Sequence, residues 1–273
     1  MRKIRGWLWG LTWLVVLAAV SRVGPPATAG EPAGEVIEKP EFVLYIPDTL
    51  DSGRRYPLIV AFSPGADADD LLRHLHEHAR THRCLLFCSK VVRNGMDVPP
   101  ALRRIATGLV PALADEYPLD PTLIIGTGVS GGGMTAHLFS FLYPNVVAAV
   151  ISNVGYIHEN SLKRPERYPQ NKICAFLTSP TDFNFKLMRE DEKFLKKRGW
   201  TTRWFEFEGG HRRAPDELFD EALGWVVGNL PATAPAVRPI DPPASLANPE
   251  PASEPASSVN PGQTTASSAV GPP

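Results

Sequence analysis

The 273-residue chain contains few cysteines and has almost no net charge. It has three Cys residues and a formal net charge of −1 at pH 7. Three cysteines are too few for a disulfide scaffold. A dedicated nucleic-acid-binding protein would carry a clear excess of basic residues, which this chain lacks. The sequence therefore excludes a disulfide-rich module and argues against a nucleic-acid partner.

The apolar segment near the N-terminus is short for a membrane-spanning helix. Residues 6–20 form a run of 15 mostly apolar residues, whereas a spanning helix needs roughly 20. Basic residues precede the run, residues 1–29 contain no acid, and Ala-Thr-Ala at 27–29 fits a cleavage site. This order is typical of a secretory signal. We predict a signal peptide over 1–29, a linker over 30–34 and secretion or export to the periplasm or cell envelope. The alternative is an uncleaved membrane anchor.

Aromatic residues are absent from the last part of the chain, residues 231–273. This segment holds 11 of the 28 prolines, together with 9 Ala and 6 Ser. Such a composition cannot bury enough apolar surface to offset the entropy lost on ordering. We therefore predict a disordered tail over 231–273 and a single folded domain over 35–230, without internal repeats.

Short apolar runs alternate with helical patterns along the predicted domain. Runs without polar alternation are typical of strands buried on both faces of a parallel sheet. The predicted strands are 41–46, 58–62, 84–88, 123–126, 146–151, 173–177 and 203–207. The predicted helices are 67–82, 101–117, 133–142, 185–198 and 216–230. Pro111 should kink or split the second of these helices. The alternation predicts an α/β domain with right-handed crossovers.

The glycine-rich segment 126–133 carries the strongest chemical signal. It contains Gly-x-Ser-x-Gly at Gly128, Ser130 and Gly132, between a predicted strand and a predicted helix. That context is the one a nucleophile elbow requires, in which a sharp turn aims the serine hydroxyl above the sheet. Ser130 is therefore the candidate nucleophile. The N–H of Gly131 and the helix N-terminus would face a developing oxyanion.

A second motif overlaps the first. Gly126, Gly128 and Gly131 also match G-x-G-x-x-G, the dinucleotide-binding fingerprint. That fingerprint expects an acid near the end of the next strand, but the first acid after the glycines is Glu159. The nucleotide hypothesis is therefore weaker than the elbow, and we predict no cofactor. A glycine-rich turn without chemistry is the remaining alternative.

A serine nucleophile needs a general base, and the base needs an orienting acid. Asp182 and His211 each follow a predicted strand, so both should lie at the same edge of the sheet as Ser130. We predict a triad of Ser130, Asp182 and His211. The alternative acids are Glu208, Asp191 and Asp216. Asn153 lies where some hydrolases place the acid, but it cannot supply a charge.

With these residues the chain resembles the α/β-hydrolase superfamily. It is most similar to secreted bacterial esterases of the carboxylesterase, polyhydroxyalkanoate-depolymerase and feruloyl-esterase type. The similarity spans about 42–230 and includes the motifs at 56–60, 120–121, 181–184 and 209–211. The resemblance implies the α/β-hydrolase fold, with a mostly parallel central sheet and helices on both faces. No long insertion interrupts the domain, so we predict no large lid.

The resemblance also implies a chemistry. Ser130 would attack a carboxylic ester, His211 would act as base and then as acid, and Asp182 would orient His211. The substrate would be a small-molecule or polymeric ester, with neither cofactor nor metal. A lasting insertion in a membrane is expected only if the signal stays uncleaved.

The segment 63–66 departs from the pattern of these relatives. They usually carry a His-Gly pair there, whereas this chain has Ser63-Pro64-Gly65-Ala66. Pro64 has no N–H to donate. The second donor of the oxyanion hole is therefore predicted to be the N–H of Gly65 or Ala66, or the Ser63 hydroxyl.

The loop over 155–170 is the longest segment on the predicted catalytic edge, and we expect it to form one wall of the pocket. The predicted pocket residues are Ser63, Tyr156 and His158.

Several other histidines and cysteines are set apart from this site. His74, His78 and His82 share one face of a predicted helix and could bind a metal. No acid or cysteine obviously completes such a site, so we predict a solvated polar face. His137 is predicted to pack in the helix after the elbow. The predicted buried free thiols are Cys84, Cys88 and Cys174.

Two other functions stay open. One is a serine peptidase of the prolyl-oligopeptidase type, although the β-propeller usual there is missing. The other is a catalytically weak or inactive binding or envelope-associated protein on a hydrolase fold. Two features motivate this alternative, namely Ser63-Pro64-Gly65 in place of the usual His-Gly pair and the predicted tail. A hydrolase fold alone does not fix a function.

Overall fold

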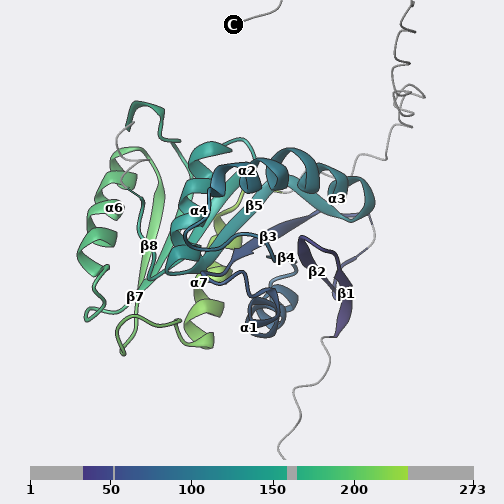
Figure 1. The fold of residues 1–273 in the computed structure, drawn as a ribbon, viewed down its shortest axis with the longest axis horizontal. Helices are drawn as coiled ribbons and strands as arrows, with labels where there is room; N and C mark the ends of the chain where they lie inside the picture. The colour runs from purple at the N-terminus through teal and green to yellow at the C-terminus, as the bar shows by residue number, and fades with distance from the viewer. Residues whose placement is uncertain (1–32, 52, 159–164, 233–273) are drawn as a thin grey trace, which may run out of the picture. The chain divides into compact units, whose positions relative to one another are not determined.

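The computed structural model describes residues 33–51, 53–158 and 165–232. The predicted signal over 1–29 lies outside the described residues, as does the predicted tail apart from Pro231 and Ala232. Both stay predictions, and so does the role of the linker. Within the described residues, eight strands form one open sheet in the order β1-β2-β4-β3-β5-β6-β7-β8 (Figure 1).

The sheet is mostly parallel, as the alternation of elements predicts. β1 pairs antiparallel with β2 and β2 with β4, whereas every other neighbouring pair is parallel. The strands are β1 (Gly34–Glu38), β2 (Phe42–Pro47), β3 (Tyr56–Phe62), β4 (Leu85–Ser89), β5 (Leu119–Val129), β6 (Val147–Asn153), β7 (Ile173–Thr178) and β8 (Thr201–Glu206).

Helices cover both faces of the sheet. The described helices are α1 (Ala68–Thr81), α2 (Val98–Arg104), α3 (Val110–Glu116), α4 (Gly131–Leu142), α6 (Phe185–Lys197) and α7 (Asp216–Asn229), with short helical turns η1 (Ile105–Leu109) and η2 (Pro165–Arg167). α2, α3, α4 and α6 contribute to the hydrophobic cluster on one face. α1 and α7 contribute to the cluster on the other. Among the described helices, none has the length and hydropathy to span a bilayer.

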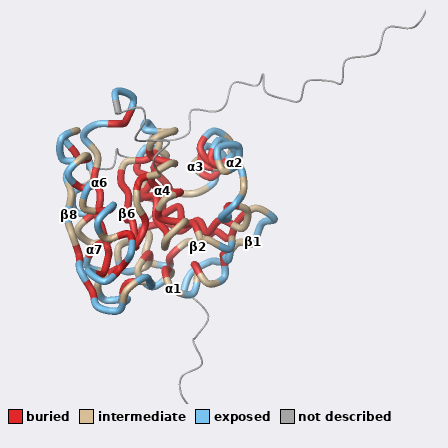
Figure 2. The backbone as a smooth tube through the Cα atoms, turned by 60° about the vertical axis from the view of Figure 1, so that its left-hand side comes forward, coloured by how far each residue is buried: buried red, intermediate tan, exposed pale blue. Residues whose placement is uncertain are grey.

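Buried residues run through the middle of the sheet (Figure 2), and β3 and β7 are buried along their whole length. All seven residues of β3 and all six of β7 are buried, because helices pack on both faces of these strands. Their continuous apolar runs were therefore readable in the sequence. β1 was not predicted, because four of its five residues are exposed and it lies at the sheet edge. β5 is also longer than predicted, since its first residues precede the apolar run.

The predicted break at Pro111 takes the form of a π-helical turn. η1 joins α2 to α3, and the Val110 N–H donates to the carbonyl of Ile105, five residues back. Proline cannot donate an intrahelical hydrogen bond, and its ring crowds the carbonyl four residues before it. The wider turn accommodates Pro111 at the start of α3.

The three cysteines are free and buried, as predicted. β3, β5 and β6 lie between β4 and β7, so Cys174 is remote from the cysteines at 84 and 88. Burial raises the pKa of the Cys84 thiol to about 12. These thiols are packing groups rather than nucleophiles.

Candidate active site

Ser130 stands at a sharp turn between β5 and α4. Its backbone has φ 54° and ψ −117°, a conformation that a non-glycine residue adopts only under constraint. The constraint is visible at Gly128 and Gly132, where an added Cβ would overlap the carbonyl oxygen of Phe62 at the end of β3. Glycine is therefore required on both sides of Ser130. The turn places the serine hydroxyl at the carboxyl edge of the sheet.

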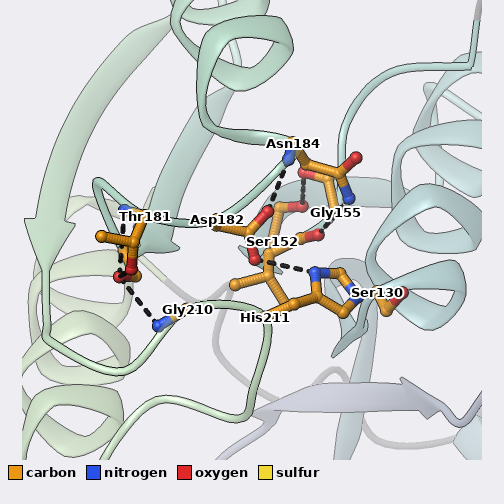
Figure 3. A network of polar contacts seen from close by, with 10 residues as sticks. Ser130, Ser152, Gly155, Thr181, Asp182, Asn184, Gly210 and His211 are labelled. Carbon is orange, nitrogen blue, oxygen red and sulfur yellow. Dashed lines mark hydrogen bonds and ion pairs between the residues drawn. The ribbon is translucent and has the colours of Figure 1, made fainter.

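Ser130, His211 and Asp182 form one chain of hydrogen bonds (Figure 3). His211 Nε2 lies 2.8 Å from Ser130 Oγ, and His211 Nδ1 lies 2.7 Å from Asp182 Oδ2. With Nδ1 protonated and donating to the carboxylate, Nε2 is left to accept the serine proton. The structure thus brings together the three residues that the sequence placed on separate loops.

The Asp182 carboxylate is fully buried and held from both sides. Its side chain has no solvent exposure, and its Oδ1 accepts the backbone N–H of Asn184 at 2.6 Å. The Asn184 side chain in turn donates to the carbonyl of Val154, beyond the end of β6. A buried carboxylate in a fixed orientation can stabilise an imidazolium that forms beside it. The role of Asn184 was not predicted, although it lies in the motif at 181–184.

The loop that carries His211 is fixed by glycines and by an aromatic ring. Gly209 and Gly210 have φ of 117° and 72°, which side chains disfavour. The Gly210 N–H donates to Ser179 Oγ at 3.1 Å, beyond the end of β7. Phe183 stacks on the imidazole of His211 with ring centroids 4.1 Å apart. The Phe183 side chain is otherwise 74% exposed, so its outer face is open to solvent beside the site.

The alternative acids Glu208, Asp191 and Asp216 make no hydrogen bond to His211 within the described residues. The Asp191 carboxylate accepts the N–H of Ile157 at 2.7 Å, and burial raises its pKa to about 7. Asn153 lies against a small enclosed cavity of about 20 Å³ that Asp216 also lines. Within the described residues, only Asp182 makes a hydrogen bond to His211 through a carboxylate.

The predicted oxyanion donors differ in availability. The N–H of Gly131, the first residue of α4, has no partner within the helix. It lies at the N-terminus of α4, which is the positive end of the helix dipole. The Gly65 N–H donates to Ser63 Oγ at 3.3 Å, and the Ala66 N–H donates to the Ser63 carbonyl at 3.2 Å. The two N–H candidates after β3 therefore have partners inside their own turn, whereas the third candidate, the Ser63 hydroxyl, accepts from Gly65 and keeps its own proton.

A cavity of about 540 Å³ opens beside Ser130 and Gly131. Besides these two residues it is lined by the β4–α2 loop over 93–97, by the start of α2, by α4 and by His158. Of the predicted pocket residues, His158 lines this cavity, but Ser63 and Tyr156 do not. The β4–α2 loop was not predicted to take part, because its residues show no motif. The loop over 155–170 is described only up to 158 and from 165 on.

The prediction of a solvated polar face is wrong for two of its three histidines, one in α1 and one at its C-terminal end. His78 Nδ1 and His82 Nε2 lie 3.1 and 3.0 Å from the same Asp220 Oδ1 on α7. Their side chains are only 12% and 19% exposed. The sequence could not reveal this, because Asp220 is 138 residues beyond His82. The part of the chain that the structure describes holds no His, Cys, Asp or Glu cluster suited to a metal.

His137 is packed in α4, as predicted, beside Phe176. It is fully buried, and desolvation lowers its pKa to about 3. It therefore stays neutral at physiological pH and serves the core rather than the site.

No family model matches the chain, and no curated protein matches its sequence. Solved structures match in fold. A thermostable esterase is 22% identical with a TM-score of 0.51, over 71% of this chain and only 61% of its own. FphF, a fluorophosphonate-binding serine hydrolase of Staphylococcus aureus, is 12% identical with a TM-score of 0.56, over 71% and 96%. A Bacillus cereus carboxylesterase is 17% identical with a TM-score of 0.54, over 68% and 92%. This chain shares their fold.

Proposed function

We propose that this chain, which has the α/β-hydrolase fold, is a serine hydrolase that cleaves carboxylic esters through an acyl-enzyme on Ser130. The observation that carries the proposal is the hydrogen-bond chain from Ser130 Oγ through His211 to the buried Asp182. The neighbouring 540 Å³ cavity has room for the substrate. The esterases and serine hydrolases of similar fold support the same reaction class.

The first half of the reaction forms the acyl-enzyme. Ser130 Oγ attacks the ester carbonyl carbon while its proton passes to His211 Nε2, and the carbonyl electron pair moves to the oxygen. Asp182 stabilises the imidazolium through the Nδ1–H that it accepts. The carbon–oxygen bond to the alcohol then breaks, and His211 returns its proton to the leaving alkoxide. The acyl group remains as an ester of Ser130.

The second half releases the acid. A water molecule gives a proton to His211 Nε2 as its oxygen attacks the acyl carbon. The bond to Ser130 then breaks, and the proton on His211 passes to Ser130 Oγ. The imidazole is 26% exposed, so water can reach it without a rearrangement of the buried side of the triad.

The experiment combines labelling with turnover. Purified chain is treated with a fluorophosphonate probe and, separately, with p-nitrophenyl esters of different acyl length. Wild type should label and hydrolyse, whereas Ser130→Ala should not label and should lose about 10⁶-fold in kcat. If the wild type does not react with the probe and hydrolyses the esters no faster than Ser130→Ala, the proposal is excluded. An amide substrate beside the esters tests the peptidase alternative.

One observation favours a second candidate, a weakly active or inactive binding protein. The N–H groups of Gly65 and Ala66 both have partners within their turn, and an oxyanion hole with a missing donor is expected to lose about 10²–10³ in kcat. Tight binding of an ester without turnover would support this candidate.

We also propose that the protein is exported. The basic start, apolar run and Ala-Thr-Ala at 27–29 support this location. Mass spectrometry of the chain produced in a bacterium with its full leader tests it. A mature N-terminus at residue 30 is expected, and a membrane-bound chain that still begins at residue 1 would favour the anchor.

A further inference from the structure

The oxyanion hole has one clear donor and lacks an obvious second. The Gly131 N–H is available at the start of α4. Pro64 has no N–H, while the N–H groups of Gly65 and Ala66 bond to Ser63. A tetrahedral intermediate of acyl transfer usually requires two donors aimed at the same oxygen. The Ser63 hydroxyl accepts from Gly65 and keeps its own proton, but no residue of the turn over 63–66 lines the cavity beside Ser130. A second donor that lies on this cavity must therefore come from outside the loop that follows β3.

Asn94, on the loop between β4 and α2, lies directly against Gly131. An added Cβ on Gly131 would overlap the Asn94 side-chain oxygen and would stand 2.8 Å from its Cγ and 2.9 Å from its Nδ2. Asn94, Gly131 and Ser130 line the same cavity. Glycine at position 131 thus leaves the space that the Asn94 amide occupies.

The backbone of Asn94 is anchored, while its amide is uncommitted. Its N–H donates to the Pro64 carbonyl at 2.9 Å, and the preceding residue, Arg93, forms a β-bridge with Gly65. Across residues 33–51, 53–158 and 165–232, the Asn94 side-chain amide makes no hydrogen bond. The loop that follows β3, whose two candidate N–H groups are already paired, thereby anchors the backbone of a residue that carries a donor side chain.

The distances allow one oxygen to bridge both groups. Two nitrogens that each donate to one oxygen at about 2.9 Å can be at most about 5.8 Å apart. A Cβ position is about 2.5 Å from the backbone nitrogen of its own residue. Asn94 Nδ2, 2.9 Å from the Gly131 Cβ position, is therefore within about 5.4 Å of the Gly131 nitrogen. A half-turn of the amide exchanges Oδ1 and Nδ2 within the same space.

We propose that Asn94 is a catalytic residue whose side-chain N–H donates the second hydrogen bond to the oxyanion formed on attack by Ser130. An asparagine amide is a competent donor for this purpose, because it is neutral and needs no proton transfer. The bond would form only as the carbonyl oxygen gains charge and moves toward the hole. This assignment rests on the ester hydrolysis proposed above.

The test compares Asn94→Ala and Asn94→Asp with wild type. The aspartate variant keeps the shape but has no N–H, and its charge would repel the oxyanion. We expect kcat for a p-nitrophenyl ester to fall about 10²–10³-fold in Asn94→Ala and further in Asn94→Asp, with KM within about threefold of wild type. Fluorophosphonate labelling of Ser130 should slow in parallel, since the phosphoryl oxygen occupies the same hole.

Asn145→Ala, in an exposed turn before β6, is the control and should match wild type. Circular dichroism and thermal unfolding show whether each variant is folded. Folded variants with kcat within about threefold of wild type, or with only KM changed, overturn the assignment of Asn94 but leave the hydrolase proposal in place. A wild-type chain with neither label nor turnover overturns both.

Discussion

The two sides of Ser130 are built in opposite ways. On the His211 side the imidazole and the Asp182 carboxylate are both hydrogen-bonded, and the Asp182 side chain is completely buried. On the cavity side the residues of the β4–α2 loop are mostly exposed, and the Asn94 amide is uncommitted in the described residues. The difference fits the roles that we propose for the two sides. A triad must be aligned before the substrate arrives, whereas donors to an oxyanion gain their partner only during the reaction.

The contrast also shows how two neighbouring loops share one role. The turn over 63–66 uses its own N–H groups to stay folded and accepts a hydrogen bond from Asn94 through the Pro64 carbonyl. The loop after β4 then provides the cavity wall and the free amide. Four predictions test this comparison, beginning with the largest effect.

Replacing the acid on the His211 side should have the largest effect on kcat. In Asp182→Asn the amide can still bond to His211, but it favours the wrong tautomer and cannot stabilise an imidazolium. We expect kcat to fall about 10⁴-fold. Steady-state hydrolysis of a p-nitrophenyl ester measures it. Glu208→Gln, at an exposed alternative acid, should stay within about threefold, and the opposite ranking would move the acid to position 208.

Asp191 carries a buried carboxylate that has no cationic partner within the described residues. It accepts the N–H of Ile157, next to His158, and burial raises its pKa from the ordinary 3.8 to about 7. Glu190 raises it further. Between pH 4 and pH 7 the folded chain therefore holds a proton that the unfolded chain releases. The free energy of unfolding should fall across this window, by up to about 1.4 kcal/mol per pH unit.

Asp191→Asn should remove this contribution, since the amide oxygen can still accept from Ile157. Urea unfolding at pH 4.5, 5.5, 6.5 and 7.5 measures the difference between variant and wild type. As the pH rises to about 7, the free energy of unfolding of the variant should increase relative to that of wild type. Above pH 7 the difference should stay constant. Asp115→Asn, at an exposed position, is the control. A difference that does not change with pH would contradict a buried, protonated Asp191.

Removing the ring that stacks on His211 should have a smaller effect. Phe183→Ala loses a contact worth about 1 kcal/mol, so we expect kcat to fall about fivefold with the pH profile of the reaction unchanged. Leu187→Ala, which removes another exposed apolar side chain, should leave kcat as it is. A loss of more than about 100-fold in Phe183→Ala would mean that the ring does more than orient the imidazole.

The smallest effect is expected on the cavity side, at Ser63. Ser63→Ala frees the Gly65 N–H from its 3.3 Å hydrogen bond. If Asn94 supplies the second donor, kcat should change by less than about threefold, because the bond is exposed and weak. A rise in kcat of tenfold or more would instead identify Gly65 as a donor that Ser63 normally restrains. The same ester assay measures both outcomes.

Elements that depend on a local pattern could be predicted from the amino-acid sequence. Continuous apolar runs predicted the central strands, and Gly-x-Ser-x-Gly between a strand and a helix predicted the turn at Ser130, because only glycine tolerates the contact with the Phe62 carbonyl. The order of Ser130, Asp182 and His211 along the chain predicted which loops meet. β1 escaped prediction because an exposed edge strand has no apolar run.

Contacts between residues far apart in the sequence could be identified only in the folded chain. The partnership of Asp220 with His78 and His82 joins α1 to α7, and no local pattern encodes it. The same is true of Asn94, which lies against Gly131 because parallel pairing sets β4 two strands away from β5. Strand order brings their carboxyl ends to one edge. Side-chain neighbours at that edge are fixed by packing between segments, which a linear pattern does not record.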